Sequence, residues 1–248
     1  MRLSEFEKDF DIRLQSESND LKYLPQVIPL AYQDWAKDVE MKGYSDLLLT
    51  LKGVMNEKEN KNPDFHLGIN IKEGYLNYKK SATPIQNLNL VSVIDIPVLD
   101  PNKLRVVVED LTFNLLEGTT KTNFTYWAGE QMYSEGKMTS RIDLEALKNA
   151  TGFKKIDGKG VLNLNGSWKG PIVYNSHNKL SKIPTFNLIG TLANGYLKLE
   201  QMPQALDKVD LDVEIFNTDG VIKNTSANVR YLSLKSLENY IEGTFKNK

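Results

Sequence analysis

Apolar and polar residues alternate with a period of two along several runs of the chain. The clearest of these runs are 65–72, 186–192 and 208–215, where most apolar side chains fall on every second position. This is the period of a β-strand that buries one face and exposes the other to water. The pattern predicts antiparallel sheets in which each strand has a single apolar face.

Short glycine-containing segments separate these runs. Lys72-Glu73-Gly74 and Ala193-Asn194-Gly195 each lie between two apolar runs, and the Asn-Gly pair favours the positive φ angles of tight hairpins. We expect both triplets to form hairpin turns. Further connections are predicted at Asp100-Pro101-Asn102 and Asp219-Gly220.

Only two stretches have the three- and four-residue spacing of a helix. The first lies near 24–38, where Pro25 and Pro29 restrict regular helix to the later half. The second runs from 144 to 150, and Asp143 precedes it as a candidate N-cap. Both helices are expected to be short and to flank a sheet.

The chain contains an internal repeat. The run 69–78 resembles the run 190–199, which lies 121 residues later, and a proline stands at the same distance before each copy. Downstream, Leu90 corresponds to Leu211. Upstream, the alignment pairs Leu49, Leu51 and Gly53 with Leu162, Leu164 and Gly166.

A repeated β unit that cannot bury its own apolar face is expected to stack along an axis. We therefore predict a mainly β fold with short flanking helices, in which antiparallel repeated units form an elongated groove or a curved sheet. The first unit is predicted to span residues 1–152 and the second residues 153–248.

Charge and cysteine content exclude several functions. The 31 basic and 32 acidic residues nearly cancel, and they are dispersed, which argues against a nucleic-acid partner. The chain has no cysteine, so disulfides, zinc–cysteine clusters and thiolate nucleophiles are excluded. No run approaches the roughly 18 apolar residues of a membrane span. Because the chain starts abruptly in a predicted strand, we expect a soluble fragment of a longer protein.

Residues typical of catalysis or metal binding are scarce. His66 and His177 are the only histidines, and neither lies in a nucleophile motif, so both are interpreted as surface residues. Asp210, Asp212 and Glu214 point to one side of a strand and are interpreted as a solvated outer face. We expect no catalytic residue, no metal site and no cofactor, and thus no enzyme.

The order of motifs along the chain resembles the AsmA-like family, and its Bacteroidetes-type members, related to AsmA and TamB, most closely. In that family a short helix leads into a glycine-terminated strand, then a proline-initiated strand, a Gly-x-x-x-Tyr segment and a Pro-Ile-x-Asn-Leu segment. The matching residues are Tyr23-Leu24-Pro25 through Trp35, Lys42-Gly43, Leu47 through Gly53, Pro63-Asp64-Phe65, Glu73 through Tyr78 and Pro84 through Leu88.

The resemblance implies a β groove with an apolar inner surface, located in the periplasm and tethered to the inner membrane. It also implies a role in lipid transport or outer-membrane assembly, with phospholipid or another acyl-chain lipid as partner. Family members usually begin with a membrane-spanning helix. That anchor is expected to lie outside this chain.

The candidate lipid-binding residues are the apolar members of the alternating runs. Acyl chains make no hydrogen-bonding demands, so an apolar strand face can bind them without a polar site. The residues predicted to line the groove are Phe65, Leu67, Ile69, Ile71, Phe186, Leu188, Leu192, Val209, Leu211, Val213 and Ile215.

Two alternatives remain at the level of sequence. The same apolar faces are equally typical of the closed core of a structural β-sandwich. Trp35, Trp127 and Trp168 are also candidates for stacking platforms in a carbohydrate-binding sandwich of the cell envelope.

Overall fold

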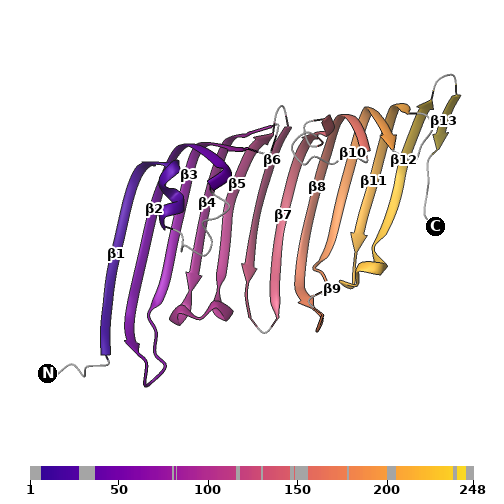
Figure 1. Cartoon of the computed structure of the whole chain (residues 1–248). Helices are drawn as coiled ribbons and strands as arrows, with labels where there is room; N and C mark the ends of the chain where they lie inside the picture. Colours follow the sequence, from indigo (N-terminus) through magenta and orange to yellow (C-terminus); the bar gives the residue numbers. More distant parts are fainter. Residues whose placement is uncertain are drawn as a thin grey trace.

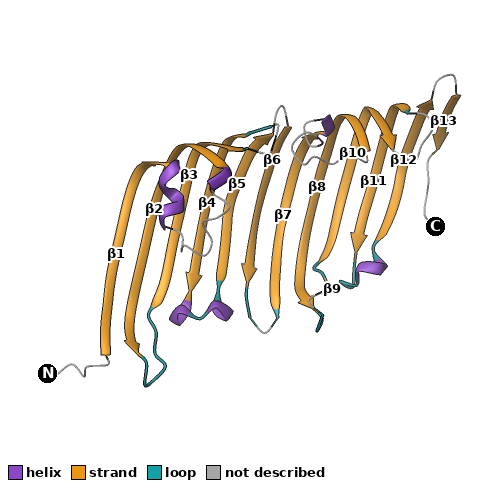
Figure 2. Ribbon diagram, in the orientation of Figure 1, coloured by secondary structure: helices purple, strands orange, loops and turns teal. Residues whose placement is uncertain are grey.

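The computed structural model describes residues 7–27, 37–79, 81, 83–115, 118–129, 131–145, 148, 156–177, 179–199, 205–236 and 239–243. Strands make up most of this part of the chain (Figure 2). They are β1 (Glu7–Asp20), β2 (Val39–Asn56), β3 (Asp64–Tyr78), β4 (Ile85–Ile96), β5 (Arg105–Leu115), β6 (Gly118–Trp127), β7 (Met132–Asp143), β8 (Ile156–Tyr174), β9 (Leu180–Lys182), β10 (Thr185–Leu199), β11 (Leu206–Asn217), β12 (Ser226–Ser236) and β13 (Asn239–Gly243).

These strands form one open antiparallel sheet. Each strand pairs with the next along the chain, except that β10 pairs with β8 and the short β9 pairs only with the end of β8. The edges of the sheet are β1 and β13, which lie at opposite ends of the molecule (Figure 1). The predicted mainly β, antiparallel class is confirmed. Because all the described strands belong to this sheet, two stacked sheets do not occur among them, and the sandwich alternative is wrong for this part of the chain.

Helix is limited to short turns. The 3-10 segments are η1 (Leu21–Val27), η4 (Pro97–Leu99), η5 (Pro101–Lys103) and η6 (Ile222–Asn224). Of the helix predicted near 24–38, the start is the 3-10 segment η1, with Pro25 inside it, and residues 28–36 lie outside the described part. In the helix predicted at 144–150, the described residues 144, 145 and 148 are helical. No described helix is long and apolar enough to cross a membrane.

The internal repeat is a duplication of strands. β3, β4 and β5 have the same lengths as β10, β11 and β12, and each pair of strands begins and ends 121 residues apart. The 3-10 segments η5 and η6 keep this offset, as do the first residues of β6 and β13. β2 and β8 begin 117 residues apart. By this equivalence β7 takes the place of β1, and the sheet continues without a break across residue 152.

The upstream part of the predicted repeat alignment is wrong by four residues. Gly53 corresponds to Gly170 rather than to Gly166, because both have positive φ, 127° and 144°. A Cβ at either glycine would also lie 3.3 Å from the Cα of a proline, Pro63 or Pro184. Apolar alternation repeats every two residues, so it fits equally well after a shift of four.

The two predicted hairpin turns are β-bulges. Glu73 and Asn194 have φ of 51° and 50°, as a turn requires, but they lie inside β3 and β10, and the register with the neighbouring strand shifts there. A bulge inserts an extra residue, often left-handed, and bends the strand without reversing it. The positive φ expected of the Asn-Gly pair is found at Asn194, and the prediction of a chain reversal at the two triplets is wrong.

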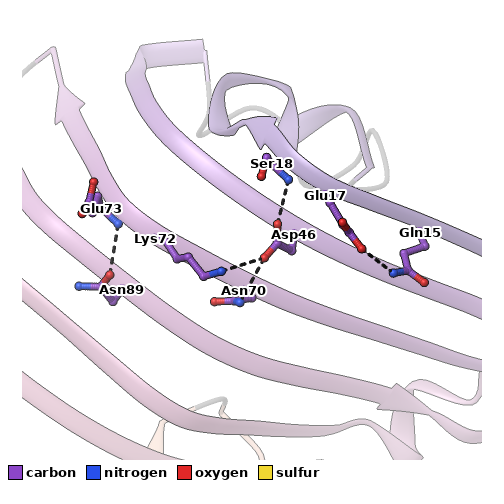
Figure 3. Close-up of polar contacts among 8 residues, drawn as sticks. All are labelled: Gln15, Glu17, Ser18, Asp46, Asn70, Lys72, Glu73 and Asn89. Atoms are coloured by element: carbon purple, nitrogen blue, oxygen red, sulfur yellow. Dashed lines mark hydrogen bonds and ion pairs between the residues drawn. The ribbon is translucent and has the colours of Figure 1, made fainter.

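The N–H of the bulged residue is satisfied by a side chain on the adjacent strand. Two such contacts lie close together in the first half of the sheet (Figure 3). The donor–acceptor pairs are Ser18 N to Asp46 Oδ1 at 2.8 Å, Glu73 N to Asn89 Oδ1 at 3.2 Å, and Asn194 N to Asp210 Oδ1 at 2.7 Å. Figure 1 shows that the strands bend over at the end of the sheet where η1 lies.

The solvent-accessible surface area of the chain agrees with a sheet that forms a single layer. The chain exposes 16,591 Å², whereas a compact protein of its mass exposes about 11,000 Å². A sheet with no second layer leaves much of both faces in contact with water.

Candidate functional site

Strand register places the predicted apolar residues of both halves on one face of the sheet. Residues paired directly across antiparallel strands lie on the same face. One row of paired positions crosses ten strands and joins Ile69 in the first half to Phe186 in the second. The row consists of Ser16, Leu47, Ile69, Ser92, Val108, Phe124, Gly136, Trp168, Phe186 and Asn217.

Parallel rows contain most of the other predicted residues. Leu67 lies in a row with Leu14, Leu49, Ile94, Val106 and Tyr126. Ile71 is connected to Leu188 and Ile215 through Leu90, Leu111, Thr122, Met138 and Gly166. The remaining predicted residues lie on the same side of the sheet, because each is an even number of residues away from a member of these rows in its own strand. They are Phe65, Leu192, Val209, Leu211 and Val213. We call this side of the sheet the apolar face and the opposite side the polar face.

Burial varies along the apolar face. Leu67, Ile71, Leu192 and Val209 are buried, with 4–8% of their surface exposed, although no second sheet covers them. Ile215 is 37% exposed, and the other predicted residues are half-buried. Neighbouring side chains within the face therefore supply much of the burial.

Short helical segments cover one end of this face. Leu21 of η1 is fully buried and belongs to a core cluster with Met41, Ile71 and Leu88. In the second half, the Leu144 Cβ lies 3.4 Å from the position that a Cβ on Gly158 would take, and Gly158 is the counterpart of Met41. Each half of the sheet is thus capped at the same end, and the apolar face continues beyond the cap.

The middle of the apolar face contains an aromatic pair, Phe124 and Trp168. Of these, Trp168 was predicted as a candidate sugar-stacking residue. The rings of Phe124 and Trp168 lie 6.4 Å apart, on either side of Gly136. A Cβ at Gly136 would come within 2.5 Å of the Trp168 ring, so the indole occupies the space above the glycine. The Trp168 Nε1–H donates to Ser134 Oγ over 2.9 Å. Phe124 was not predicted because its strand is rich in threonine and lacks clear alternation.

The tryptophans do not form a common sugar platform among the described residues. Trp168 lies on the apolar face, whereas Trp127 follows Tyr126 of that face and so points to the other side. The Trp127 ring packs edge-on against Tyr133, with the ring centroids 5.3 Å apart. Trp35 lies outside the described part.

The polar face carries ladders of charged and amide side chains. Arg230 lies 3.7 Å from Asp212 and 3.8 Å from Glu214, and Glu214 also accepts a hydrogen bond from Asn187 at 2.7 Å. These contacts agree with the interpretation of this strand as a solvated outer face. No cluster of three potential metal ligands occurs within the described residues.

The histidines have different surroundings. His66 Nδ1 lies 2.7 Å from Asp95 Oδ1 on the half-exposed polar face. His177 is exposed in the turn after β8. Their environments are those expected for surface residues.

Asp46, on the polar face of the first half, accepts hydrogen bonds from three donors. It accepts from Ser18 N, from Asn70 Nδ2 at 3.3 Å and from Lys72 Nζ at 3.3 Å (Figure 3). The Ser18 N–H and the Lys72 ammonium hold the pKa of Asp46 below its usual value, because both stabilise the ionised carboxylate.

Two hollows, of about 880 and 480 Å³, lie against the sheet. The lining of the larger includes Glu135, Lys137 and Lys169 of the polar face, and it also includes Phe124, Trp168 and Phe186 of the row on the apolar face. The smaller takes in Arg13, Asp46 and Lys72. The smaller also takes in Leu47 and Ile69, so each hollow is lined by consecutive residues of neighbouring strands that belong to both faces of the sheet.

No known protein family, no curated protein sequence and no solved structure matches this chain.

Proposed function

We propose that this chain is a non-enzymatic β module of a bacterial cell envelope that holds the acyl chains of phospholipid on its apolar face. The observation that carries the proposal is the row of directly paired positions from Ile69 to Phe186, which makes one apolar surface out of both halves of the sheet. An extended apolar surface of this kind in a soluble protein is typical of a binding surface.

Acyl chains fit this surface by their chemistry. They are long and flexible and need no hydrogen-bond partner, so they match a face of aliphatic and aromatic side chains. The face is broad and open, which suits a ligand that enters and leaves sideways. The resemblance in motif order to the AsmA-like family supports the same function: transport of lipid or assembly of the outer membrane, in the periplasm, with an inner-membrane anchor outside this chain.

Two adjacent residues of β10 offer a matched test. Leu188 is on the apolar face and Ile189 is on the polar face, where it is 36% exposed and paired with Glu214. Leu188→Lys places a charge among the apolar side chains, whereas Ile189→Lys places the same charge opposite a carboxylate. Each variant is expressed in bacteria and purified without detergent, and its bound phospholipid is measured by native mass spectrometry beside the wild type.

We expect the wild type and Ile189→Lys to carry phospholipid and Leu188→Lys to lose it. Circular dichroism and thermal melts check that Leu188→Lys remains folded. If folded Leu188→Lys keeps as much lipid as Ile189→Lys, or if the wild type carries no lipid and takes up none from vesicles, the proposal is wrong.

A further inference from the structure

The smaller hollow, of about 480 Å³, lies over strands β1 to β4 and opens to the polar side of the sheet. Its lining includes Arg13 and Gln15 but not Leu14 between them, and it passes from Asn70 to Lys72 without the apolar-face residue between those two. Side chains alternate between the two faces of a strand, so residues that line the hollow two positions apart point to the same side. A ligand in this hollow would therefore lie on the side away from the proposed acyl chains.

Gly68 makes room for the hollow. Strand register places it between Leu48 on β2 and Val93 on β4, and the nearest atom to a Cβ added at Gly68 is the Leu48 Cβ at 3.7 Å. Because Gly68 has no side chain, the lining reaches the main chain of β3, and Ile69 belongs to it. Leu48, Val91 and Val93 surround the glycine, and we call these three residues the aliphatic floor of the hollow.

The second half of the sheet differs at the same positions. The counterpart of Gly68, 121 residues later, is Ile189, which is 36% exposed on the polar face. The counterpart of Val93 is Glu214, which accepts a hydrogen bond from Asn187. The fold thus accepts a large side chain where the first half has a glycine, so the fold alone does not require a glycine at position 68.

Polar side chains of β1 border one side of the aliphatic floor (Figure 3). Arg13 Nη2 donates to Gln15 Oε1 over 3.3 Å, and Gln15 Nε2 donates to Glu17 Oε1 over 3.1 Å. A guanidinium group has five N–H donors and a carboxylate has about four acceptor positions. Arg13 and Glu17 therefore keep donors and acceptors for a ligand.

The opposite side of the floor is bordered by Asn70 and Lys72, which Asp46 holds in place (Figure 3). Asp46 Oδ2 accepts from Asn70 Nδ2 and from Lys72 Nζ, both over 3.3 Å. Within the described residues, this leaves the amide oxygen of Asn70 as an acceptor and two N–H groups of Lys72 as donors. Donors and acceptors are thus available on both sides of the floor.

The lining selects a class of ligand. The charges of Arg13 and Lys72 balance those of Glu17 and Asp46, which favours a neutral ligand over a phosphate or a nucleotide. The aliphatic floor requires a ligand with an apolar surface, and the borders require hydroxyl groups that both donate and accept. A pyranose ring has these two properties, because its C–H face is apolar and its rim carries hydroxyl groups.

We propose that this hollow binds a neutral pyranose sugar. The C–H face of the ring lies over Gly68 and the aliphatic floor, and its hydroxyl groups bond to Arg13 and Glu17 on one side and to Asn70 and Lys72 on the other. Because the floor is aliphatic and the hollow is open, we expect a dissociation constant on the order of 1 mM. The proposal does not rest on lipid binding by the apolar face.

NMR titration of the full-length, ¹⁵N-labelled chain tests the proposal at this affinity. The probes are three neutral disaccharides: cellobiose, lactose and N,N′-diacetylchitobiose. At least one of them is expected to shift the backbone amide signals of Gly68 and Asn70 in a saturable way. Sorbitol is the control ligand, because it has the hydroxyl groups of a sugar but no ring face, and it is expected to leave these signals unchanged.

Two variants locate the sugar. Gly68→Ile gives the first half the residue that the second half has at 189; it is expected to stay folded and to bind the sugar at least about tenfold more weakly. Arg13→Gln removes the donors of one border and is expected to weaken binding similarly. The matched control is Lys137→Gln, because Lys137 occupies the position of β7 that corresponds to Arg13 and lies outside this hollow. It is expected to bind like the wild type.

A wild type whose spectrum does not respond to any of the three disaccharides overturns the proposal, as do equal shifts with sorbitol. Wild-type affinity in both Gly68→Ile and Arg13→Gln also overturns it, as does a loss of binding in Lys137→Gln as large as in Arg13→Gln. Circular dichroism confirms that each variant is folded. Leu188→Lys is expected to bind the sugar normally, so the sugar and the lipid proposals can fail independently.

Discussion

The backbone N–H of Asn194 donates to Oδ1 of Asp210 on the neighbouring strand over 2.7 Å. Asn194 is the left-handed residue of a bulge in β10, and the side chain of Asp210 replaces the ladder partner that the bulge removes. In the first half of the sheet, 121 residues earlier, Glu73 and Asn89 make the same contact at 3.2 Å. One acceptor is a carboxylate and the other an amide, so the acceptor oxygen, rather than the charge, is common to both.

The first prediction concerns this contact. Asp210→Ala leaves the Asn194 N–H without its acceptor and is expected to lower the free energy of unfolding by about 1 kcal/mol. Asp210→Asn keeps an acceptor oxygen, as Asn89 does, and is expected to lose less than half as much. Urea unfolding followed by circular dichroism measures both. Equal losses for the alanine and asparagine variants would show that the charge of Asp210, rather than its oxygen, stabilises the bulge.

The second prediction concerns the close approach of glycines at the bulges. Gly160 has φ of 107°, and a Cβ there would lie 3.1 Å from the Cα of Gly195. Gly160→Ala is expected to lower the free energy of unfolding by about 1–3 kcal/mol, because alanine is strained at this φ.

Gly68→Ala is the matched control. Its φ is not in the left-handed region, and the nearest atom to an added Cβ is the Leu48 Cβ at 3.7 Å. The control is expected to be neutral or slightly stabilising, because alanine reduces the entropy of the unfolded chain. If Gly160→Ala melts at the temperature of the control, the backbone strain inferred at this bulge is absent.

The third prediction compares two leucines in one row. Leu67 and Leu14 both pair with Leu49, from opposite sides, but they are 7% and 61% exposed. Leu67→Glu is expected to lower the free energy of unfolding by several kcal/mol, a large part of the roughly 5–15 kcal/mol that holds an average domain together. Leu14→Glu is expected to change it by no more than about 0.5 kcal/mol.

Thermal and urea unfolding measure the loss of stability in these two variants. Similar losses in both variants would mean that the apolar face is covered to the edge of the sheet. No loss in Leu67→Glu would mean that the middle of the face is open to water even without ligand.

The fourth prediction concerns acid stability. The pKa of Asp46 is lowered, first by the Ser18 N–H and then by Lys72, from an ordinary value of 3.8. A carboxyl group whose pKa is lower in the folded state stabilises the fold at pH values above its unfolded pKa, and this contribution disappears as the pH falls through the folded pKa. Asp46→Asn removes the contribution at neutral pH.

We therefore expect Asp46→Asn to melt below the wild type at pH 7 and to approach it as the pH is lowered below about 3.8. Melting temperatures at a series of pH values give the difference between the two proteins. A difference that stays constant down to the acid range would show that the hydrogen bonds of Asp46 contribute and its ionisation does not.

The sequence predicts the class of fold well because alternation is a local signal. The runs 65–72 and 208–215 lie in β3 and β11 with their apolar positions on one face of the sheet, and the repeat from 69 to 190 keeps its offset through four pairs of strands. The Asn194-Gly195 pair also signals positive φ, and Asn194 has it, whereas Gly195 does not. Whether such a residue reverses the chain or bends it depends on the strands that pair on both sides, and these pairings are not local.

The composition of the candidate site was only partly predictable. The position of Phe124 beside Trp168 follows from the register of β6, β7 and β8, in which a glycine at 136 makes room for the indole. Nothing in the threonine-rich run around Phe124 indicates which face it occupies. In the same way, the acceptance of a backbone N–H by Asp210 depends on a strand pairing that its own neighbours in the sequence do not reveal.

The pairing of β6 with β7 joins the last strand of one unit to the first strand of the next with the same hydrogen-bonding pattern used inside each unit. At the usual spacing of about 4.8 Å, six strands add roughly 29 Å to the width of the sheet. Duplication of one such gene segment would therefore lengthen the protein by a fixed step without requiring a new interface. The width of the sheet in such a protein can therefore change during evolution by whole six-strand units.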